Sequence, residues 1–332
     1  MPTAATTILV ILGALVITLI AASLHFYQVA VSRKGNKKAM SSSPDLEQDD
    51  NPFTPPEVMA WVREQPLEDV SIVSHDGLTL RGYYLPASRP SDRTVILAHG
   101  YTGDAIGNMS ALAKLYHESL GYNVLMPDAR GHGRSDGEYI GFGWHERKDY
   151  GKWIDYVIGR VGAGSQIVLH GISMGGATVL MASGEKLPDQ VRGIVSDCAY
   201  TSAKDILSYQ LKRLFKLPAV PFVPLTSLVC RLRAGYLFGE ASAEKQVARS
   251  TKPILFIHGE ADTFVPFEMV HRLYDSCVSI KEKLVIPNAG HAVAYFTDRE
   301  LYAGALRSFL GRFVHDRSAA AEESRVPAQV NG

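Results

Sequence analysis

The chain has 332 residues, of which 46% are hydrophobic and 20% charged, and its 34 basic and 34 acidic side chains give no net charge. This composition excludes a disordered, collagen-like or disulfide-stapled chain. The balanced charge gives no general attraction to nucleic acid, so we expect no nucleic-acid partner. The three cysteines, Cys198, Cys230 and Cys277, are far apart and lack metal-ligand spacing, so we expect free, packed thiols.

The N-terminal segment is strongly apolar. Residues 8–31 contain no charged side chain, and as a helix this run would reach about 36 Å, which exceeds a hydrocarbon layer of about 30 Å. The run therefore predicts a single transmembrane anchor at residues 8–31. A cleaved signal peptide is the alternative, because residues 21–23 resemble a cleavage site, although the usual basic segment is missing.

The flanks of the globular part are polar. Basic side chains follow the span within residues 33–38, which predicts that the rest of the chain lies in the cytoplasm. Residues 32–67 show no apolar periodicity, and we expect a flexible tether there. Residues 316–332 are small and polar, and we expect a disordered tail.

Residues 68–315 alternate short β-branched runs with helix-length segments. This pattern is typical of an α/β domain with a mostly parallel sheet covered by helices on both faces. An antiparallel hairpin, turning at Asp76-Gly77, opens an expected eight-stranded sheet. The parallel strands are expected at Val95–Ala98, Asn123–Met126, Ile167–His170, Gly193–Ser196, Ile254–Ile257 and Leu284–Ile286. Because ligands bind at the carboxyl ends of such strands, function is expected in the loops that follow them.

The connection before the next-to-last strand is too long for a plain crossover. Residues 198–252 carry three prolines between positions 218 and 224, and we interpret them as an inserted helical lid. Residues 201–250 hold eight basic and three acidic side chains, so the lid is basic although the whole chain is neutral.

The strongest motif is Gly171-Ile172-Ser173-Met174-Gly175, which lies between a predicted strand and a predicted helix. A serine on such a tight turn needs small neighbours two residues away on either side, and its hydroxyl stands at the sheet edge. Ser173 is therefore our candidate nucleophile. The alternative interpretation, an ordinary glycine-rich turn, is disfavoured by the strand-to-helix context.

A serine hydroxyl needs a base, and the base needs an orienting acid. His291 lies in a glycine-containing loop just beyond the last predicted strand and is our candidate base. Asp262, after the preceding strand, is our candidate acid, with Glu260 and Asp197 as alternatives. The chain order Ser, Asp, His is that of α/β hydrolases.

The turn after the first parallel strand, at His99-Gly100-Tyr101, is expected to complete an oxyanion hole. Its donors would be the backbone N–H groups of Tyr101 and Met174. We interpret His99 as a residue that braces this loop.

A further glycine-containing loop follows the second parallel strand, at residues 128–135. Its glycines miss the dinucleotide-binding spacing, and we expect Asp128 and Arg130 to pair there. The chain holds no nucleotide-loop, zinc or calcium motif, so no cofactor and no metal are predicted.

These motifs together resemble the α/β-hydrolase superfamily over residues 68–315. The chain is most similar to lidded, single-pass bacterial members of the esterase and serine-aminopeptidase-like branches. The resemblance implies a cofactor-free serine hydrolase that forms an acyl-serine and then hydrolyses it. A serine at the elbow disfavours dehalogenase and epoxide-hydrolase chemistry, whose family members carry aspartate there.

Three functions remain open at this point. The first is a membrane-anchored hydrolase of small-molecule carboxylic esters or thioesters. The second is a serine peptidase of the aminopeptidase-like type, and the third is a catalytically silent, membrane-anchored binding scaffold. The lid interleaves apolar and basic residues over Tyr209–Leu217, which suggests contact with an anionic membrane surface, unless this helix simply packs its apolar stripe on the core.

Overall fold

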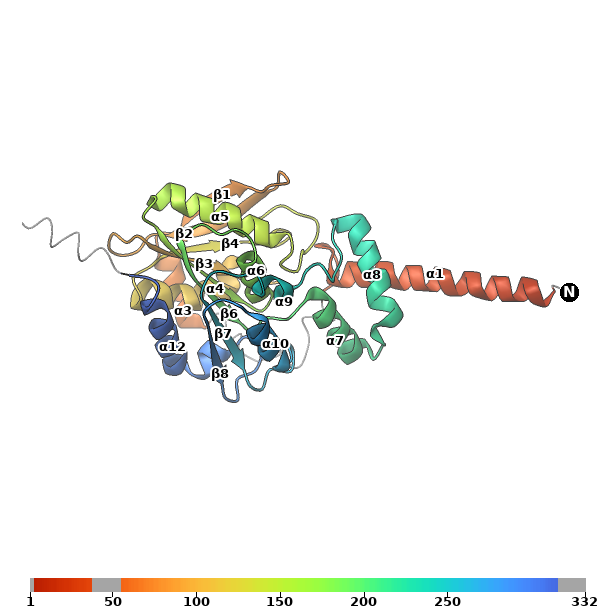
Figure 1. The fold of residues 1–332 in the computed structure, drawn as a ribbon. Coiled ribbons are helices and arrows are strands. Elements are labelled where there is room, and N and C mark those ends of the chain that lie inside the picture. Colours follow the sequence, from red (N-terminus) through yellow and green to blue (C-terminus); the bar gives the residue numbers. More distant parts are fainter. Residues whose placement is uncertain (1–2, 38–54, 316–332) are drawn as a thin grey trace, which may run out of the picture.

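The computed structural model describes residues 3–37 and 55–315. Its centre is an eight-stranded sheet with the order β1-β2-β4-β3-β5-β6-β7-β8 (Figure 1). The hairpin strands β1 (Glu68–Val73) and β2 (Thr79–Leu85) are antiparallel, and β2 also pairs antiparallel with β4. The parallel strands are β3 (Arg93–Ala98), β4 (Asn123–Pro127), β5 (Gln166–Ile172), β6 (Val191–Asp197), β7 (Ile254–Gly259) and β8 (Lys281–Ile286). The predicted fold class is confirmed, and every expected strand is present.

Helices cover both faces of the sheet, and each face has its own apolar core. One face carries α5 (Glu146–Val161), α6 (Met174–Ser183), α9 (Ala243–Val247) and α10 (Glu268–Ser276). The other carries α3 (Pro56–Glu64), α4 (Ala105–Lys114) with its π-helical extension η1 (Leu115–Ser119), α11 (Ala294–Thr297) and α12 (Arg299–Gly311). Strands β4, β5 and β7 are buried along their whole length, which explains why they lack alternation in the sequence.

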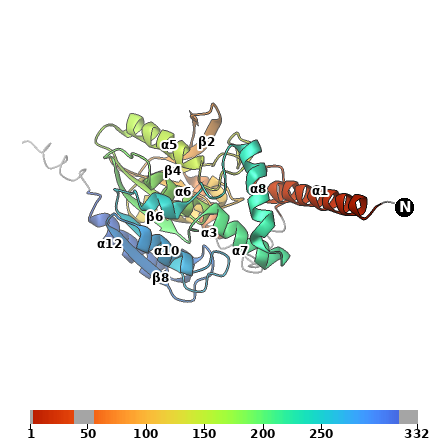
Figure 2. The same cartoon turned by 45° about the vertical axis from the view of Figure 1, so that its right-hand side comes forward.

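The long connection between β6 and β7 is helical, as predicted. It contains α7 (Ala203–Phe215), α8 (Ala219–Ala234) and the short α9. Ser202 and Ser242 cap α7 and α9 by accepting backbone N–H groups. Helix α8 lies across the domain end of the N-terminal helix (Figures 1 and 2).

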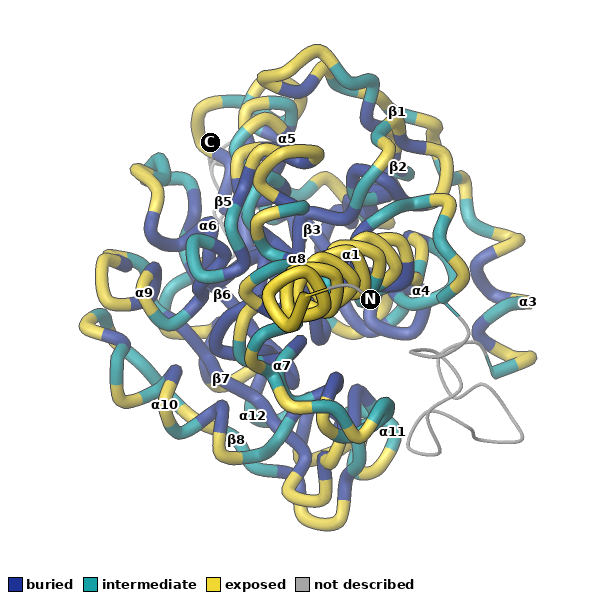
Figure 3. The backbone as a smooth tube through the Cα atoms, turned by 90° about the vertical axis from the view of Figure 1, so that its right-hand side faces the viewer, coloured by how far each residue is buried: buried dark blue, intermediate teal, exposed yellow. Residues whose placement is uncertain are grey.

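The N-terminal helix α1 (Ala4–Ala30) is long and apolar enough to cross a membrane. Its first part, residues 4–22, is exposed or half-buried (Figure 3), and it projects from the domain (Figure 1). From Ser23 onward the domain covers one side of the helix, so that Tyr27, Ala30 and Val31 are buried. The helix therefore ends inside the fold of the globular domain.

The segment after α1 is bound to the domain as well. Ser32 forms a β-bridge with Tyr139, and the Arg33 guanidinium donates to the backbone oxygens of Gly133 and Ser135. Helix α3 packs on α4, with Trp61 buried in the core. The expectation of a flexible tether over 32–67 is therefore wrong for residues 32–37 and 55–64. Residues 65–67 join α3 directly to β1. The remaining residues of that tether, 38–54, and the expected tail at 316–332 lie outside the described residues.

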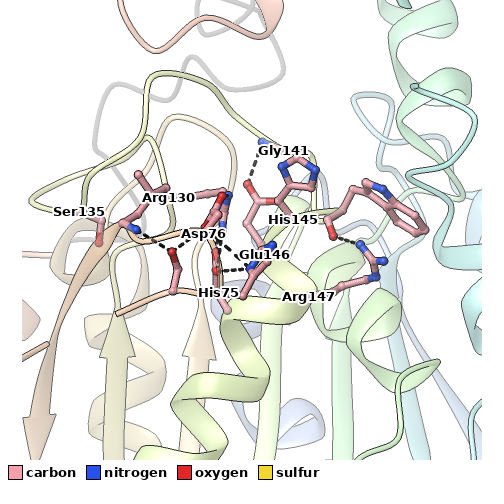
Figure 4. Close-up of polar contacts among 12 residues, drawn as sticks. His75, Asp76, Arg130, Ser135, Gly141, His145, Glu146 and Arg147 are labelled. Atoms are coloured by element: carbon pink, nitrogen blue, oxygen red, sulfur yellow. Dashed lines mark hydrogen bonds and ion pairs between the residues drawn. The ribbon is translucent and has the colours of Figure 1, made fainter. Parts of the chain in front are cut away.

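The loop that receives residues 31–33 is held by a buried ionic network (Figure 4). The Arg130 guanidinium, which is fully buried, donates to both carboxylate oxygens of Asp149 at 2.6 and 2.7 Å and to Asp76 at 2.8 and 3.0 Å. Glu146 accepts the backbone N–H groups of Gly141 and Gly143 at 2.8 and 3.0 Å. The network fixes the backbone on which Val31 and Ser32 pair.

The expected pair of Asp128 and Arg130 is wrong. Asp128 instead accepts the backbone N–H groups of Ala105 and Arg134, each at 2.9 Å. A left-handed glycine at position 133 (φ 45°) brings the chain back onto Asp128, while the Arg130 guanidinium bonds to Asp76 and Asp149 instead.

Arg130→Met should lower the free energy of unfolding by roughly 3–5 kcal/mol, because it leaves buried carboxylates without their counter-charge. Arg134→Met is the matched control, since Arg134 pairs with the largely exposed Asp69 and should cost about 1 kcal/mol or less. Urea unfolding of the full chain in detergent, followed by tryptophan fluorescence, measures both. Equal losses would show that the buried network does not stabilise this loop.

Candidate active site

Ser173 lies on the turn between β5 and α6 with φ 56° and ψ −115°, a conformation that is strained for a residue with a side chain. The turn closes because Gly171 and Gly175 lack side chains. A Cβ atom on Gly171 would collide with the carbonyl oxygen of Gly175, and one on Gly175 would collide with that of Ala98. The Ser173 N–H donates to the Asp197 carbonyl at 2.8 Å, which fixes the turn to β6.

The structure brings the three predicted side chains together. The Nε2 atom of His291 lies 2.9 Å from the Ser173 Oγ, and its Nδ1 atom lies 2.8 Å from the Asp262 Oδ2. His291 follows β8, Asp262 follows β7 and Ser173 follows β5, so all three stand at the carboxyl edge of the sheet. With a proton on Nδ1, the imidazole donates to the carboxylate and can accept the serine proton on Nε2.

Asp262 is held in place from its other side. Its Oδ1 accepts the backbone N–H groups of Phe264 and Val265 at 2.9 and 2.8 Å. The fully buried His258 brings its Nε2 within 3.2 Å of the Asp262 Oδ2, a contact that the sequence analysis missed. Burial alone would raise the pKa of the Asp262 carboxyl, but the charges and hydrogen bonds of His291 and His258 lower it well below its ordinary value. Asp262 is therefore ionised at neutral pH.

The two alternative acids lie elsewhere. Glu260 is exposed to solvent. Asp197 is buried, and its Oδ2 accepts a hydrogen bond from the Tyr302 hydroxyl at 3.1 Å rather than from an imidazole. Burial raises the pKa of Asp197 to about 6.

A buried polar chain continues behind Asp197, and no signal in the sequence indicated it. The Tyr302 hydroxyl also lies 3.0 Å from the His170 Nε2, and the His170 Nδ1 lies 3.1 Å from the Tyr116 hydroxyl. Burial lowers the pKa of His170 to about 3, so this imidazole is neutral. The chain satisfies polar groups inside the core on the α4 and α12 face.

Met174 directly follows Ser173, and the turn that carries Tyr101 passes beside it. Gly100, which precedes Tyr101, lies so close that a Cβ atom on it would be 3.8 Å from the Ser173 Cβ. Met174 is the first residue of α6, so its N–H has no acceptor within the helix. His99 braces the turn as predicted, because its Nε2 accepts the Ala129 N–H at 2.9 Å and its Nδ1 donates to the Gly100 oxygen at 2.8 Å.

Two groups of possible metal ligands occur among the described residues. Asp262 and His291 form one of them with the buried Cys198, but both already bond to each other within the site. The other contains Asp76 and Asp149, whose carboxylates are bound to the Arg130 guanidinium. Neither set offers ligands without a competing partner.

Comparisons with known proteins agree with this architecture. A family model described as alpha/beta hydrolase fold matches residues 93–221, and one described as Serine hydrolase (FSH1) matches residues 180–295. The uncharacterized protein YqkD of Bacillus subtilis is 30% identical over 239 residues, which cover 72% of this chain and 77% of that protein. The uncharacterized protein YfhR of Escherichia coli K12 is also 30% identical, over 70% of this chain and 75% of its own. Among solved structures, the Pyrococcus furiosus esterase Pf2001 superposes with a TM-score of 0.63 at 26% identity and covers 79% of this chain and 97% of its own.

The sheet order, the elbow between β5 and α6 and these matches define the class of protein, and the chain belongs to the α/β-hydrolase superfamily. Within that superfamily it is of the serine-hydrolase, esterase-like type.

The raised pKa of Asp197 predicts a pH-dependent stability. A carboxyl whose pKa rises from 3.8 to about 6 on folding binds its proton more tightly in the folded state. Protonation of Asp197 thus adds to the free energy of unfolding below about pH 4, and this contribution is lost as the pH rises through about 6. The free energy of unfolding changes by an amount on the order of 3 kcal/mol. Asp197→Asn should lack this loss, so its stability relative to the parent should improve between pH 4 and pH 8 by about that amount. Urea unfolding at the two pH values measures it, and a pH-independent difference would contradict the assignment.

Proposed function

We propose that the protein hydrolyses carboxylic esters or thioesters through an acyl-serine, with Ser173 as nucleophile, His291 as general base and Asp262 as orienting acid. The observation that carries the proposal is the position of the His291 imidazole, which lies within hydrogen-bond distance of both the Ser173 hydroxyl and the Asp262 carboxylate. The backbone N–H groups of Tyr101 and Met174 complete the proposed site.

In the first half of the reaction, the His291 Nε2 takes the hydroxyl proton while the Ser173 Oγ attacks the carbonyl carbon of the ester. The carbonyl oxygen becomes an oxyanion, which accepts hydrogen bonds from the Tyr101 N–H and from the Met174 N–H at the positive end of α6. The intermediate then collapses, the bond to the alcohol or thiol breaks, and His291 returns the proton to the leaving group.

In the second half, a water molecule takes the place of the alcohol. His291 removes a proton from this water as its oxygen attacks the acyl-serine carbonyl. A second oxyanion forms in the same place, the bond to the Ser173 Oγ breaks, and His291 returns the proton to the serine. The products are a carboxylic acid and the free enzyme, and Asp262 stays ionised throughout because it stabilises the imidazolium.

We propose further that the enzyme is anchored in a membrane. The exposed part of α1 serves as the anchor, and the basic residues that follow it, including Arg33 and Lys34, place the domain on the cytoplasmic side. Helices α7 and α8 form the lid over the site.

Ser173→Ala should abolish hydrolysis of p-nitrophenyl butyrate, by about six orders of magnitude, together with labelling by a fluorophosphonate probe. Ser208→Ala, which changes a serine on α7 outside the site, is the matched control and should retain both activities. Labelling that survives in Ser173→Ala would contradict the nucleophile. Faster turnover of aminoacyl amides than of esters would support a peptidase, and a parent protein that neither reacts nor labels would be a binding scaffold.

Asp262→Asn should lower kcat by about 10⁴, because an amide cannot hold the required imidazole tautomer. Asp197→Asn provides the comparison, since the Asp197 side chain bonds to Tyr302, and it should cost less than about tenfold. Steady-state kinetics on the same ester measure both variants. A larger loss in Asp197→Asn would make Asp197 the acid.

A further inference from the structure

Helices α7 and α8 lie beside the domain end of α1 (Figure 2). An apolar slot lies between these three helices. Its free volume is about 40 Å³. Its walls come from all three helices and from Phe238, which follows α8. The lining residues are Phe26, Val29, Ala30, Leu207, Gln210, Leu211, Leu214, Phe215, Phe222, Val223, Thr226 and Phe238.

Aromatic rings from α1 and the insertion narrow this slot. The Phe26 ring packs edge-on against Phe215 at 5.4 Å and against Phe222 at 5.8 Å between centroids. Phe26 belongs to the candidate membrane span, whereas Phe215 and Phe222 lie at the turn between α7 and α8. Among the described residues, this turn and α1 are thus joined by contacts of aromatic rings, which can separate more easily than a hydrogen-bonded junction.

Two residues of the slot lining bond to residues that adjoin the proposed catalytic groups. The backbone oxygen of Ala30 accepts the Tyr101 hydroxyl at 2.8 Å, and the Gln210 amide donates to the Phe264 oxygen at 2.7 Å. The Phe264 ring lies 4.8 Å from the His291 ring. Ala30 on the slot wall thus bonds to Tyr101 of the proposed oxyanion turn. Gln210 on the slot wall bonds to Phe264, whose ring packs against His291.

The outer end of the slot lies where α1 leaves the membrane. The exposed part of α1, residues 4–22, is about 28 Å long, which matches a hydrocarbon layer of about 30 Å. Phe26 follows this part by a single helical turn. Leu228 and Leu232 on α8 are 55% and 87% exposed, as expected of a helix that meets the membrane boundary rather than water. Figure 3, which looks along α1, shows α7 and α8 beside its base.

Two buried polar atoms also face this apolar region without a hydrogen-bond partner in the described chain. They are the Gln210 Oε1 and the Thr226 Oγ1, on side chains whose residues are 2% and 4% exposed. A buried acceptor without a partner costs free energy unless a ligand satisfies it. Gln210 lies toward the catalytic residues, which is where the polar part of an ester would sit if its chain filled the slot.

From these observations we infer that the slot binds the acyl chain of a carboxylic ester dissolved in the membrane, and that α1 forms one wall of this substrate site as well as the anchor. The inference rests on the proposed ester hydrolysis and names its substrate class as a long-chain lipid ester. The free volume of about 40 Å³ is far too small for an acyl chain while the α7–α8 turn lies against α1. The chain therefore enters from the leaflet along Phe26 only when this turn moves away from α1 and widens the slot, and its carbonyl then meets Ser173.

The test uses the full-length protein in phosphatidylcholine vesicles with two esters, water-soluble p-nitrophenyl acetate and vesicle-borne p-nitrophenyl palmitate. Leu214→Trp fills the slot and should lower the ratio of kcat/KM for the palmitate to kcat/KM for the acetate at least tenfold. Leu232→Trp is the matched control, because this exposed leucine of α8 is outside the slot, and it should leave both rates within twofold.

The two substrates separate the possible failures. An unchanged palmitate rate in Leu214→Trp, with acetate hydrolysis intact, overturns the acyl slot and leaves the proposed ester hydrolysis standing. A parent protein without acetate hydrolysis overturns the proposed function itself. If Leu214→Trp loses both activities, Phe222→Ala is the second test. Removing this aromatic ring from the slot should raise the ratio of palmitate to acetate hydrolysis severalfold. An unchanged ratio overturns the slot.

Discussion

The backbone of Ser173 is the constraint on which the site depends. A positive φ at a residue with a side chain persists only where the surroundings hold it, and here the two neighbouring strands do so. Strand β5 pairs with β3 and β6 on either side, and the Ser173 N–H is bonded to Asp197 at the end of β6. Because the turn is fixed, the hydroxyl stands at the sheet edge, where the loops after β7 and β8 bring Asp262 and His291 to it.

The sequence predicts those features of the structure that depend on residues close together along the chain. The strands are short β-branched runs, and the elbow needs glycines at fixed offsets, so both leave a pattern in neighbouring residues. The contact of His258 with Asp262 spans only four positions, yet it depends on how β7 ends, and no pattern marks it. The chain from Asp197 through Tyr302 and His170 to Tyr116 joins four separate elements, which come together only when the helices pack on the sheet.

For the segment after α1, the sequence predicted flexibility where the structure is ordered. Its residues lack apolar periodicity, which predicted a tether, but its order comes from backbone pairing with a distant loop. Ile140 donates its N–H to the Val31 oxygen at 2.8 Å, and Arg33 donates to the Glu138 oxygen at 2.9 Å. Backbone hydrogen bonds place few demands on side-chain type, so composition does not reveal them. The buried Arg130 network supplies the rigid partner that makes this pairing possible.

Tyr101 connects the N-terminal helix α1 with the proposed site. The last carbonyl groups of α1 carry the negative end of its dipole and have no partner within the helix. The Tyr101 hydroxyl donates to Ala30, and the Lys37 ammonium donates to Val29 at 3.0 Å. Burial lowers the pKa of Lys37 to about 8, so at neutral pH it is mostly protonated and able to donate. The same tyrosine offers its backbone N–H to the proposed oxyanion hole, so the end of α1 and the oxyanion turn are fixed to each other by one residue. An enzyme whose only need was attachment to a surface could join its anchor through any flexible linker. A rigid junction at the oxyanion turn is instead what an enzyme requires if its substrate reaches the serine along the anchor itself.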